Sequence, residues 1–430
     1  MNKKLENIFK GDKGIWMVFF FLCLISVVEV YSASSSLTYK GGNYVMPIIK
    51  HIVILSVGIF LMVMTLNIRC KYFKIATPVL LLLSFITLIW VYFAGQSTNG
   101  AQRWIPILGF QFQPSEIAKG TMVLATAQIL SAMQTDNGAD RHAMKYILIV
   151  CLFIIPLIGL ENLSTAVLIS GVIFIMMFIG QVPKIQLGKL MGVVLIGIVT
   201  VVAAVLLLGN DVQQPSTKNN LSDKAKTEQV AQTSAHSHGI LHRMDTWKSR
   251  IVHFLDNKEV APEDVDLDKD AQVAHANIAI ATSNIIGKGP GNSTERDFLS
   301  QAFSDFIYSI IIEELGLEGA IFVALLYIIL LYRTGRIAGR CENNFPAFLA
   351  MGLALLLVTQ ALFNMAVAVG LVPVTGQPLP LISKGGTSSI TNCIYIGAIL
   401  SVSRSAKRVA DSNDGKRLYN EPCEDFSRTK

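Results

Sequence analysis

About ten long apolar stretches dominate the sequence, and they restrict the chain to a membrane fold. They lie near 15–34, 46–66, 75–94, 114–132, 145–161, 163–181, 188–209, 306–332, 346–371 and 388–405. Crossing the hydrocarbon layer of a bilayer takes roughly 17 to 25 residues of helix. Backbone polar groups find no water there, so they must be satisfied within the segment, as they are in a helix. The sequence therefore predicts an all-α, polytopic membrane protein with about ten transmembrane helices.

Composition and charge exclude other classes of protein. Hydrophobic residues make up 52% of the 430 residues and charged residues only 15%, which is too apolar for a soluble globular chain of this length. The formal net charge is +6, but the basic residues follow the short connections between apolar stretches, so no nucleic acid partner is expected. The six cysteines are scattered without a C-x-x-C pair, and neither disulfides nor a thiol metal site is indicated.

The distribution of Lys and Arg predicts how the chain is oriented. Positively charged connections stay on the cytoplasmic side, and an even number of spans puts both termini on one side. The basic residues that share that side are Lys3, Lys4, Lys10, Lys13, Arg69, Lys71, Lys74, Arg141, Lys145, Lys184, Lys189, Arg333, Arg336, Arg340 and those from Arg404 to Lys430. We therefore expect a multi-pass protein of the cytoplasmic (inner) membrane, surrounded by membrane lipid, with both termini in the cytoplasm.

The chain is expected to be organised as one membrane domain, residues 1–430, with a large extracytoplasmic loop at 210–304 before the eighth helix. A cytoplasmic tail follows at 406–430. Within the loop, residues 211–238 are polar and contain no aromatic side chain. Such a composition cannot bury enough apolar surface to fold, so this part is expected to be disordered.

The later part of the loop carries two helical patterns. Residues 243–256 place apolar side chains at helical spacing, with Arg243 and Arg250 elsewhere on the turn, which predicts a helix lying on the outer leaflet. Residues 271–286 form the second pattern. The Gly-rich stretch that follows is predicted to be a turn rather than a phosphate cradle, because the P-loop pattern is absent.

Asp305 lies at the threshold of the apolar stretch that begins near residue 306, and Glu313 and Glu314 lie inside it. An ionisable residue at a helix centre costs roughly 2.5 to 3.5 kcal/mol on insertion scales. Glu313 lies about 12 Å beyond Asp305 at a rise of ~1.5 Å per residue, so the cost falls on Glu313, whereas Asp305 sits near the interface. Two interpretations of Asp305 stay open at this point: a helix-start residue favoured by the helix dipole, or a functional carboxylate.

A second charged group lies in the stretch 114–132. Pro114 suits the first helical position, which makes Gln113 the expected cap and brings Glu116 close to free backbone amides at the helix start. Glu116 therefore has a structural explanation. Lys119, three residues on, shares its face and is expected to pair with it inside the bilayer.

Two further basic residues face outward in the predicted topology. Arg103 stands beside Trp104, which suits either an interfacial anchor or a contact to an anionic lipid headgroup. Lys384 lies in a stretch, 364–389, that Pro and Gly residues break. Its backbone groups must be satisfied by protein or by a watery cavity, so it is either a ligand site or a tight outward turn.

Three segments closely resemble the signature regions of the SEDS (shape, elongation, division and sporulation) family, which includes FtsW and RodA: "AQRWIPILGFQFQPSEIAKG", "FSDFIYSIIIEELG" and "LVPVTGQPLPLISKGGTSS". The third segment is more similar to FtsW-like than to RodA-like members. The resemblance implies a peptidoglycan glycosyltransferase that polymerises lipid II outside the cytoplasmic membrane, in septal wall synthesis during cell division. It also implies a class B penicillin-binding protein and other divisome proteins as partners.

The resemblance assigns roles to single residues. Asp305 matches the family's essential carboxylate and is the candidate catalytic base. The candidate substrate-binding residues, from the resemblance and from charge together, are Arg103, Glu116, Lys119, Lys384, Arg243, Arg250, Glu313 and Ser388. The chain departs from the family pattern at Asn162, which replaces an acid, at Phe303 and Ser304, where His-Thr is common, and at Lys384, where Tyr is frequent.

The chemistry explains why such residues are needed. A sugar 4-hydroxyl attacks an anomeric carbon that carries a lipid-linked pyrophosphate, which requires a base for the hydroxyl and cations for the leaving charge. No cofactor is fixed by the sequence; a divalent cation, Mg²⁺ or Mn²⁺, is an open alternative for neutralising that charge. Two other functions stay open: a lipid II flippase, which also needs charges inside the membrane, and a division scaffold.

Overall fold

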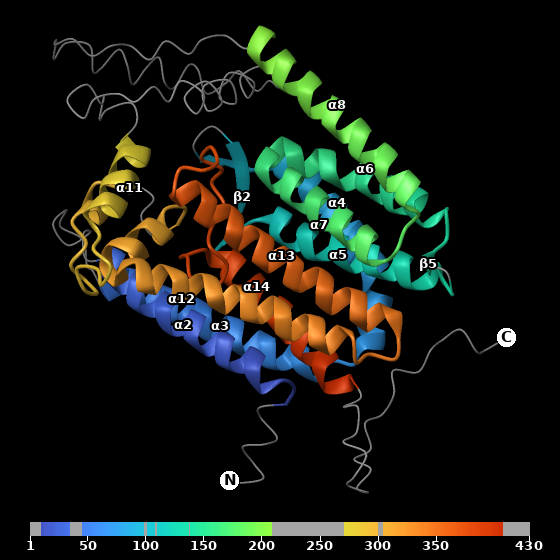
Figure 1. The fold of residues 1–430 in the computed structure, drawn as a ribbon, viewed down its shortest axis with the longest axis horizontal. Coiled ribbons are helices and arrows are strands. Elements are labelled where there is room, and N and C mark those ends of the chain that lie inside the picture. The colour runs from blue at the N-terminus through green and yellow to red at the C-terminus, as the bar shows by residue number, and fades with distance from the viewer. Residues whose placement is uncertain are drawn as a thin grey trace, which may run out of the picture. The chain divides into compact units, whose positions relative to one another are not determined.

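The computed structural model describes residues 10–34, 45–98, 101–107, 110–136, 138–208, 271–299 and 304–406. Its helices are α2 (Lys13–Ser34), α3 (Val45–Asn67), α4 (Cys70–Ala94), α5 (Pro114–Ala132), α6 (Ala143–Glu161), α7 (Leu163–Ile179), α8 (Lys184–Leu208), α11 (Ala271–Thr282), α12 (Ile307–Ala338), α13 (Asn344–Ala368) and α14 (Gly386–Ser405), with a 3-10 turn η2 (Glu295–Asp297). The expected all-α membrane fold is confirmed (Figure 1).

Each apolar stretch of the sequence coincides with one of these helices. Among the described residues, α2, α3, α4, α6, α12 and α13 are long and apolar enough to cross a membrane, and α7 is a shorter apolar helix. α5 and α14 are less apolar than these helices. They carry polar side chains, such as Lys119 and Asn392, that are buried within the protein.

Small antiparallel sheets were not expected from the sequence. Strands β1 (Gln96–Thr98), β2 (Ala101–Ile107) and β3 (Phe110–Phe112) pair in that order between α4 and α5, and β4 (Gln134–Thr135) pairs with β5 (Gly138–Ala139) between α5 and α6. The residues that connect neighbouring helices therefore satisfy part of their backbone hydrogen bonding in hairpins.

Hydrogen bonds gather several helix termini at one end of the bundle, which we call the basic end. Arg333, late in α12, binds Asp12, just before α2, at 2.7 Å. Ser401 of α14 donates to the carbonyl of Ile68, just after α3, at 2.5 Å. Lys, Arg and helix termini coincide here: Lys10, Lys13, Arg69, Lys71, Lys74, Arg333, Arg336, Arg340 and Arg404 lie at or near these termini.

The opposite termini meet at a second end, which we call the site end. The backbone amide of Gln113, before α5, donates to the Thr387 hydroxyl at the start of α14 at 3.2 Å. Gln377 donates to Thr165, near the start of α7, at 2.6 Å. The end of α2 joins them through a hydrogen bond from Ser32 to Glu314. Long helices such as α2 and α12 lie side by side between the two ends (Figure 1).

The chain divides into two compact units. The first contains residues 1–184, 266–371 and 375–430, and the second contains residues 185–265 and 372–374. α8 supplies the described helix of the second unit. The predicted outer-leaflet helix at 243–256 with Arg243 and Arg250, the segment 211–238 predicted to be disordered, and the tail beyond residue 406 lie outside the described residues.

Candidate active site

Asp305 lies at the site end, two residues before the first residue of α12. Its side chain is partly buried, and its Oδ1 accepts a hydrogen bond from the hydroxyl of Ser304 at 2.9 Å. Its backbone carbonyl accepts from the side-chain amide of Asn364, in α13, at 2.8 Å. The neighbouring Ser304 carbonyl accepts from the Ser383 hydroxyl at 2.7 Å. Two buried side chains from distant parts of the sequence, Asn364 and Ser383, therefore hold the backbone of this turn.

The broken segment between α13 and α14 supports the same turn. Asn364 donates a second hydrogen bond to the Gln377 carbonyl at 2.7 Å, and Gln360 donates to the Pro378 carbonyl at 3.0 Å. Tyr327 of α12 donates to the Pro380 carbonyl. Protein side chains thus satisfy the free carbonyls of non-helical backbone, as expected for such backbone between membrane helices.

Lys384 and Ser388 follow directly on this segment. Lys384 is half-buried, next to the Ser383 that binds the Ser304 carbonyl. Burial lowers the pKa of Lys384, and the nearby Lys50 lowers it further. Ser388 is buried in the first turn of α14, where Asn392 donates to its hydroxyl at 3.4 Å. The residue before Lys384 thus binds the residue before Asp305, and Ser388 is a buried residue of α14.

Glu116 and Lys119 form the buried ion pair that their spacing predicts. Lys119 Nζ lies 2.9 Å from Glu116 Oε1 and donates to Gln360 Oε1 at 2.7 Å. Both side chains are almost completely buried. The cap Gln113 and Pro114 in the first turn are also as expected.

One expectation for Glu116 is wrong. Its carboxylate does not accept a hydrogen bond from the free amides at the helix start, because Oε1 faces Lys119 and Oε2 has no partner among the described residues. Its role in the structure is to compensate the charge of Lys119. For Lys119 to bind a pyrophosphate group, it would have to exchange Glu116 and Gln360 for the phosphate.

The remaining predicted residues are distributed as follows. Arg103 lies in β2, at the irregularity between the pairs Gln96–Trp104 and Ser97–Gln102. Asn162, where the family pattern has an acid, caps α7 by accepting a hydrogen bond from the Ser164 amide at 3.0 Å. A short polar side chain at this position therefore has a structural role.

α12 is not one continuous helix. Gly316 has φ 69° and ψ −171°, which interrupts the helical conformation directly after Glu313, Glu314 and Leu315. The interruption frees backbone groups on both sides of it. The carbonyls of Glu313 and Glu314 accept from the amides of Lys288 at 2.9 Å and Gly289 at 2.8 Å.

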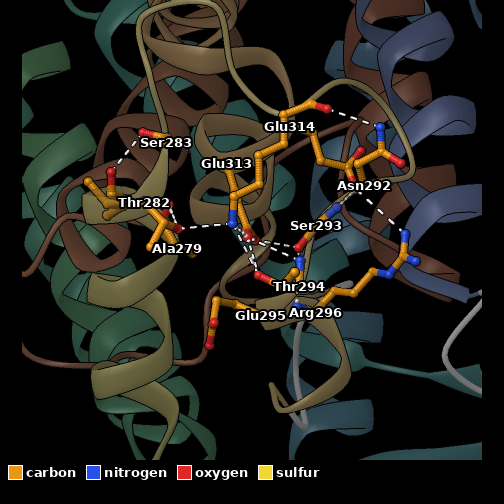
Figure 2. Close-up of polar contacts among 12 residues, drawn as sticks. Ala279, Thr282, Ser283, Asn292, Ser293, Thr294, Glu295, Arg296, Glu313 and Glu314 are labelled. Carbon is orange, nitrogen blue, oxygen red and sulfur yellow. Dashed lines mark hydrogen bonds and ion pairs between the residues drawn. The ribbon is translucent and has the colours of Figure 1, made fainter.

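Both carboxylate oxygens of Glu313 have hydrogen-bond partners in the segment that precedes α12 in the sequence. Its Oε1 accepts from Lys288 Nζ at 2.6 Å and from the Thr294 amide at 3.1 Å and hydroxyl at 2.9 Å, and its Oε2 accepts from the Ser293 hydroxyl. The side chain is completely buried. Protein groups therefore surround the carboxylate, and Figure 2 shows it facing Ser293 and Thr294.

Glu314 is held by the same segment and by α2. Its Oε2 accepts from the Gly291 amide at 2.9 Å, and its Oε1 accepts from Ser32 of α2 and lies 3.7 Å from Arg296. Arg296 in turn donates to the Ser32 hydroxyl at 2.9 Å. We call the set Glu313, Glu314, Lys288, Ser293, Thr294 and Arg296 the clasp.

The clasp and the partners of the Asp305 turn are residues that sequence reasoning missed. Lys288, Ser293 and Arg296 belong to a stretch predicted to be a plain turn, and Ser383 and Asn364 are ordinary polar residues in apolar surroundings. The adjacent acids Glu313 and Glu314, followed by Gly316, were the signal available in the sequence. A pair of buried carboxylates requires donors nearby, but the sequence does not say which segment supplies them.

The donor set does not match a metal site built by the protein. Among the described residues, no group of three or more His, Cys, Asp or Glu side chains could hold a metal ion. The clasp carboxylates already have Lys, Arg, Ser and amide partners.

Comparisons with known proteins agree with the fold and with the signature segments. Residues 12–408 match the family described as "Cell cycle protein", whose model groups FtsW, RodA and SpoVE. A "probable peptidoglycan glycosyltransferase FtsW" of Geobacter metallireducens is 29% identical over 410 residues, covering 94% of this chain and 97% of the relative. A relative of the same name from Coxiella burnetii is 28% identical, covering 90% of this chain and 95% of the relative.

Two solved structures share the fold. A chain from a peptidoglycan synthase complex, described in terms of the coordination of polymerization and crosslinking, superposes with a TM-score of 0.66 at 22% identity, covering 92% of this chain and 98% of that chain. The rod shape determining protein RodA of Thermus thermophilus superposes with a TM-score of 0.61 at 21% identity, covering 94% and 99%. The match of the family model to almost the whole sequence shows that this chain belongs to the cell cycle protein family of FtsW, RodA and SpoVE.

Proposed function

We propose that this chain is a peptidoglycan glycosyltransferase that polymerises lipid II into glycan strands on the outer face of the cytoplasmic membrane, in septal wall synthesis during cell division. The curated relatives named as FtsW glycosyltransferases support this activity. The observation that carries it is the environment of Asp305: a partly buried carboxylate on a turn whose two carbonyls are held by Ser383 and Asn364, with Lys384 next to Ser383 in the sequence.

In the proposed reaction, Asp305 accepts the proton of the attacking sugar 4-hydroxyl. The hydroxyl oxygen forms a bond to the anomeric carbon, and the bond from that carbon to the pyrophosphate oxygen breaks, so the electron pair leaves with the lipid-linked pyrophosphate. Direct attack inverts the anomeric carbon. A carboxylate suits the role of base only if it is held within hydrogen-bond reach of the hydroxyl, which the fixed turn supports.

Cationic groups near the site end would stabilise the leaving pyrophosphate. Lys384 is our first candidate because it adjoins the Ser383 that holds the Asp305 turn. Arg103, Arg243, Arg250 and Ser388 are proposed as further substrate contacts. Lys119 and Glu116 are proposed to act from inside the protein, since each is buried in contact with the other.

The chain is a multi-pass membrane protein by its helices and its family. We propose that the basic end is cytoplasmic, because Lys and Arg accumulate on that side of membrane proteins. The site end with Asp305 then faces the outside, where lipid II would be polymerised. A class B penicillin-binding protein is the proposed partner; the related fold solved within a peptidoglycan synthase complex supports such an association.

A lipid II flippase is the second candidate, and one observation favours it. The buried Glu116–Lys119 pair is a charged group inside the bundle, and transporters carry such groups along their substrate paths. One experiment distinguishes the two. Purified chain with the partner is placed in vesicles that contain labelled lipid II, and both strand extension and movement of the label between leaflets are measured. Extension without accelerated movement supports the polymerase, and movement without extension refutes it.

A further inference from the structure

At the break at Gly316, the backbone of α12 is hydrogen-bonded by residues 285–299, which we call the outer segment. Where the helix stops, Lys288 and Gly289 donate their amides to the carbonyls of Glu313 and Glu314, and Glu318 donates its amide to the Ile285 carbonyl at 3.5 Å. These are the groups that lose their helical partners at a break. The outer segment therefore replaces the hydrogen bonds of the missing turn.

Two glycines permit this contact. A Cβ placed on Gly316 would lie 2.1 Å from the Ile285 carbonyl oxygen, and one on Gly287 would lie 2.3 Å from the Gly316 nitrogen. Both residues also have positive φ, 69° and 80°, a conformation that glycine adopts without strain. The backbones of the two segments touch directly, so little relative movement is possible while the contact exists.

The side chains of the clasp hold the contact closed. Two carboxylates, Glu313 and Glu314, meet two cations, Lys288 and Arg296, so their formal charges cancel. Both carboxylates are completely buried. Removing one partner from a buried ion pair leaves an uncompensated charge, which is strongly destabilising. The clasp is thus expected to open as a unit.

The turn with Asp305 lies between the two parts that the clasp joins. In the sequence it lies between residue 299, the last described residue of the outer segment, and Ile307, the first residue of the α12 portion that ends at Glu313 and Glu314; residues 300–303 lie outside the described residues. Ser383 and Asn364 hold the same turn from the opposite direction. The clasp therefore joins the two segments that flank the turn in the sequence.

We propose that the clasp is a positioning device for Asp305, and that Glu313 and Glu314 are positioning residues and not substrate contacts. The catalytic part of this proposal rests on the proposed function, in which Asp305 is the base. The structural part, that the clasp fixes the Asp305 turn, does not depend on it. A displacement of about 1 Å in a catalytic group can lower a rate by about a hundredfold.

The test compares Glu313→Gln and Glu314→Gln with Glu318→Gln. Glu318 is a matched control because it lies on the same helix just beyond the break, with an exposed side chain. Hydrogen–deuterium exchange is measured in lipid nanodiscs for peptides covering 285–299, 304–312 and α13. The rate of strand synthesis is measured against lipid II concentration, which gives kcat and KM separately.

We expect both clasp variants to exchange about tenfold faster in 285–299 and also faster in 304–312, with α13 unchanged. We expect kcat to fall about tenfold to a hundredfold, with KM within about twofold of the wild type. Glu318→Gln should behave as the wild type. If a clasp variant does not fold, Ser293→Ala and Thr294→Val each remove only part of the hydrogen bonding to Glu313, and they should show a smaller effect of the same pattern.

Three results would overturn the proposal. Faster exchange in 285–299 with unchanged exchange in 304–312 would mean that the clasp does not hold the Asp305 turn, whatever the activity. Unchanged exchange with a raised KM would mean that Glu313 contacts the substrate. Faster exchange in both peptides with unchanged kcat would mean that the position of the turn does not matter for the rate. A wild-type protein that makes no strand while exchange behaves as expected refutes the proposed function and supports the structural part.

Discussion

Among single residues, three buried charges of this protein have close partners. Lys119 contacts Glu116 and Gln360, Glu313 contacts Lys288, and Glu314 contacts Arg296. Glu29 in α2 differs, since both its oxygens are buried without a hydrogen-bond partner among the described residues. A charge buried without a partner is costly. Replacing one member of a buried pair is therefore expected to lower the free energy of unfolding strongly, because its partner stays buried and unpaired.

The Glu116–Lys119 pair gives the first prediction. Lys119→Met leaves Glu116 buried and unpaired and should lower the free energy of unfolding by about 3 to 5 kcal/mol. Glu116→Ala should likewise lower the yield of folded protein. The double variant Glu116→Gln with Lys119→Met should recover most of the loss, because no charge remains buried. Thermal unfolding in detergent measures this; losses that simply add would show that the two side chains do not stabilise each other.

At the scale of elements, the positions of the helices and the Pro/Gly-broken stretch before α14 were predictable, and the break inside α12 was not. Long apolar stretches identify helices because lipid leaves a chain few alternatives. The break in α12 depends on a contact between Gly316 and Gly287, and the Asp305 turn on hydrogen bonds from Ser383 and Asn364. Such contacts join residues far apart in the sequence, so no local pattern reveals them. The same holds for the clasp, because the donors to Glu313 belong to the segment 285–299 and not to α12 itself.

Gly316→Ala gives the prediction at this scale. The added methyl group would meet the Ile285 carbonyl oxygen at 2.1 Å, and alanine disfavours the positive φ. We expect a lower melting temperature and loss of protection from deuterium exchange in residues 285–299.

Gly171→Ala is the matched control for this change. Gly171 lies within α7, where an added Cβ meets nothing within 4 Å, and alanine favours a helix interior by up to about 1 kcal/mol. Its melting temperature should stay the same or rise. A stable Gly316→Ala protein with a protected outer segment would contradict the role given to the break.

At the scale of the whole molecule, the basic end and the site end lie at opposite ends of the helix bundle. Helix termini with many basic residues meet around Asp12, Arg333 and Arg69, and the candidate site lies at the opposite termini. The sequence predicted this separation through the distribution of Lys and Arg. It did not predict how the site end is assembled, because that depends on packing between α5, α12, α13 and α14.

The orientation gives the prediction at this scale. A fluorescent protein fused after Lys430 should fluoresce, because it would fold in the cytoplasm, and alkaline phosphatase inserted within 211–238 should be active, because it works only outside. The reasoning is that the basic end resists translocation. A dark C-terminal fusion or an inactive phosphatase insertion would contradict this orientation. Asp305 would then lie on the wrong side of the membrane for lipid II polymerisation.

The most direct test of the central claim is the synthesis of glycan strands by Asp305→Asn. The protein, co-purified with its candidate class B partner, is supplied with lipid II, and the products are separated on a gel. Asp136→Asn is the control, because Asp136 is exposed in the connection between α5 and α6. We expect strands from the wild type and from Asp136→Asn, and none from a folded, partner-bound Asp305→Asn. Full-length strands from Asp305→Asn would contradict the assignment of Asp305 as the catalytic base.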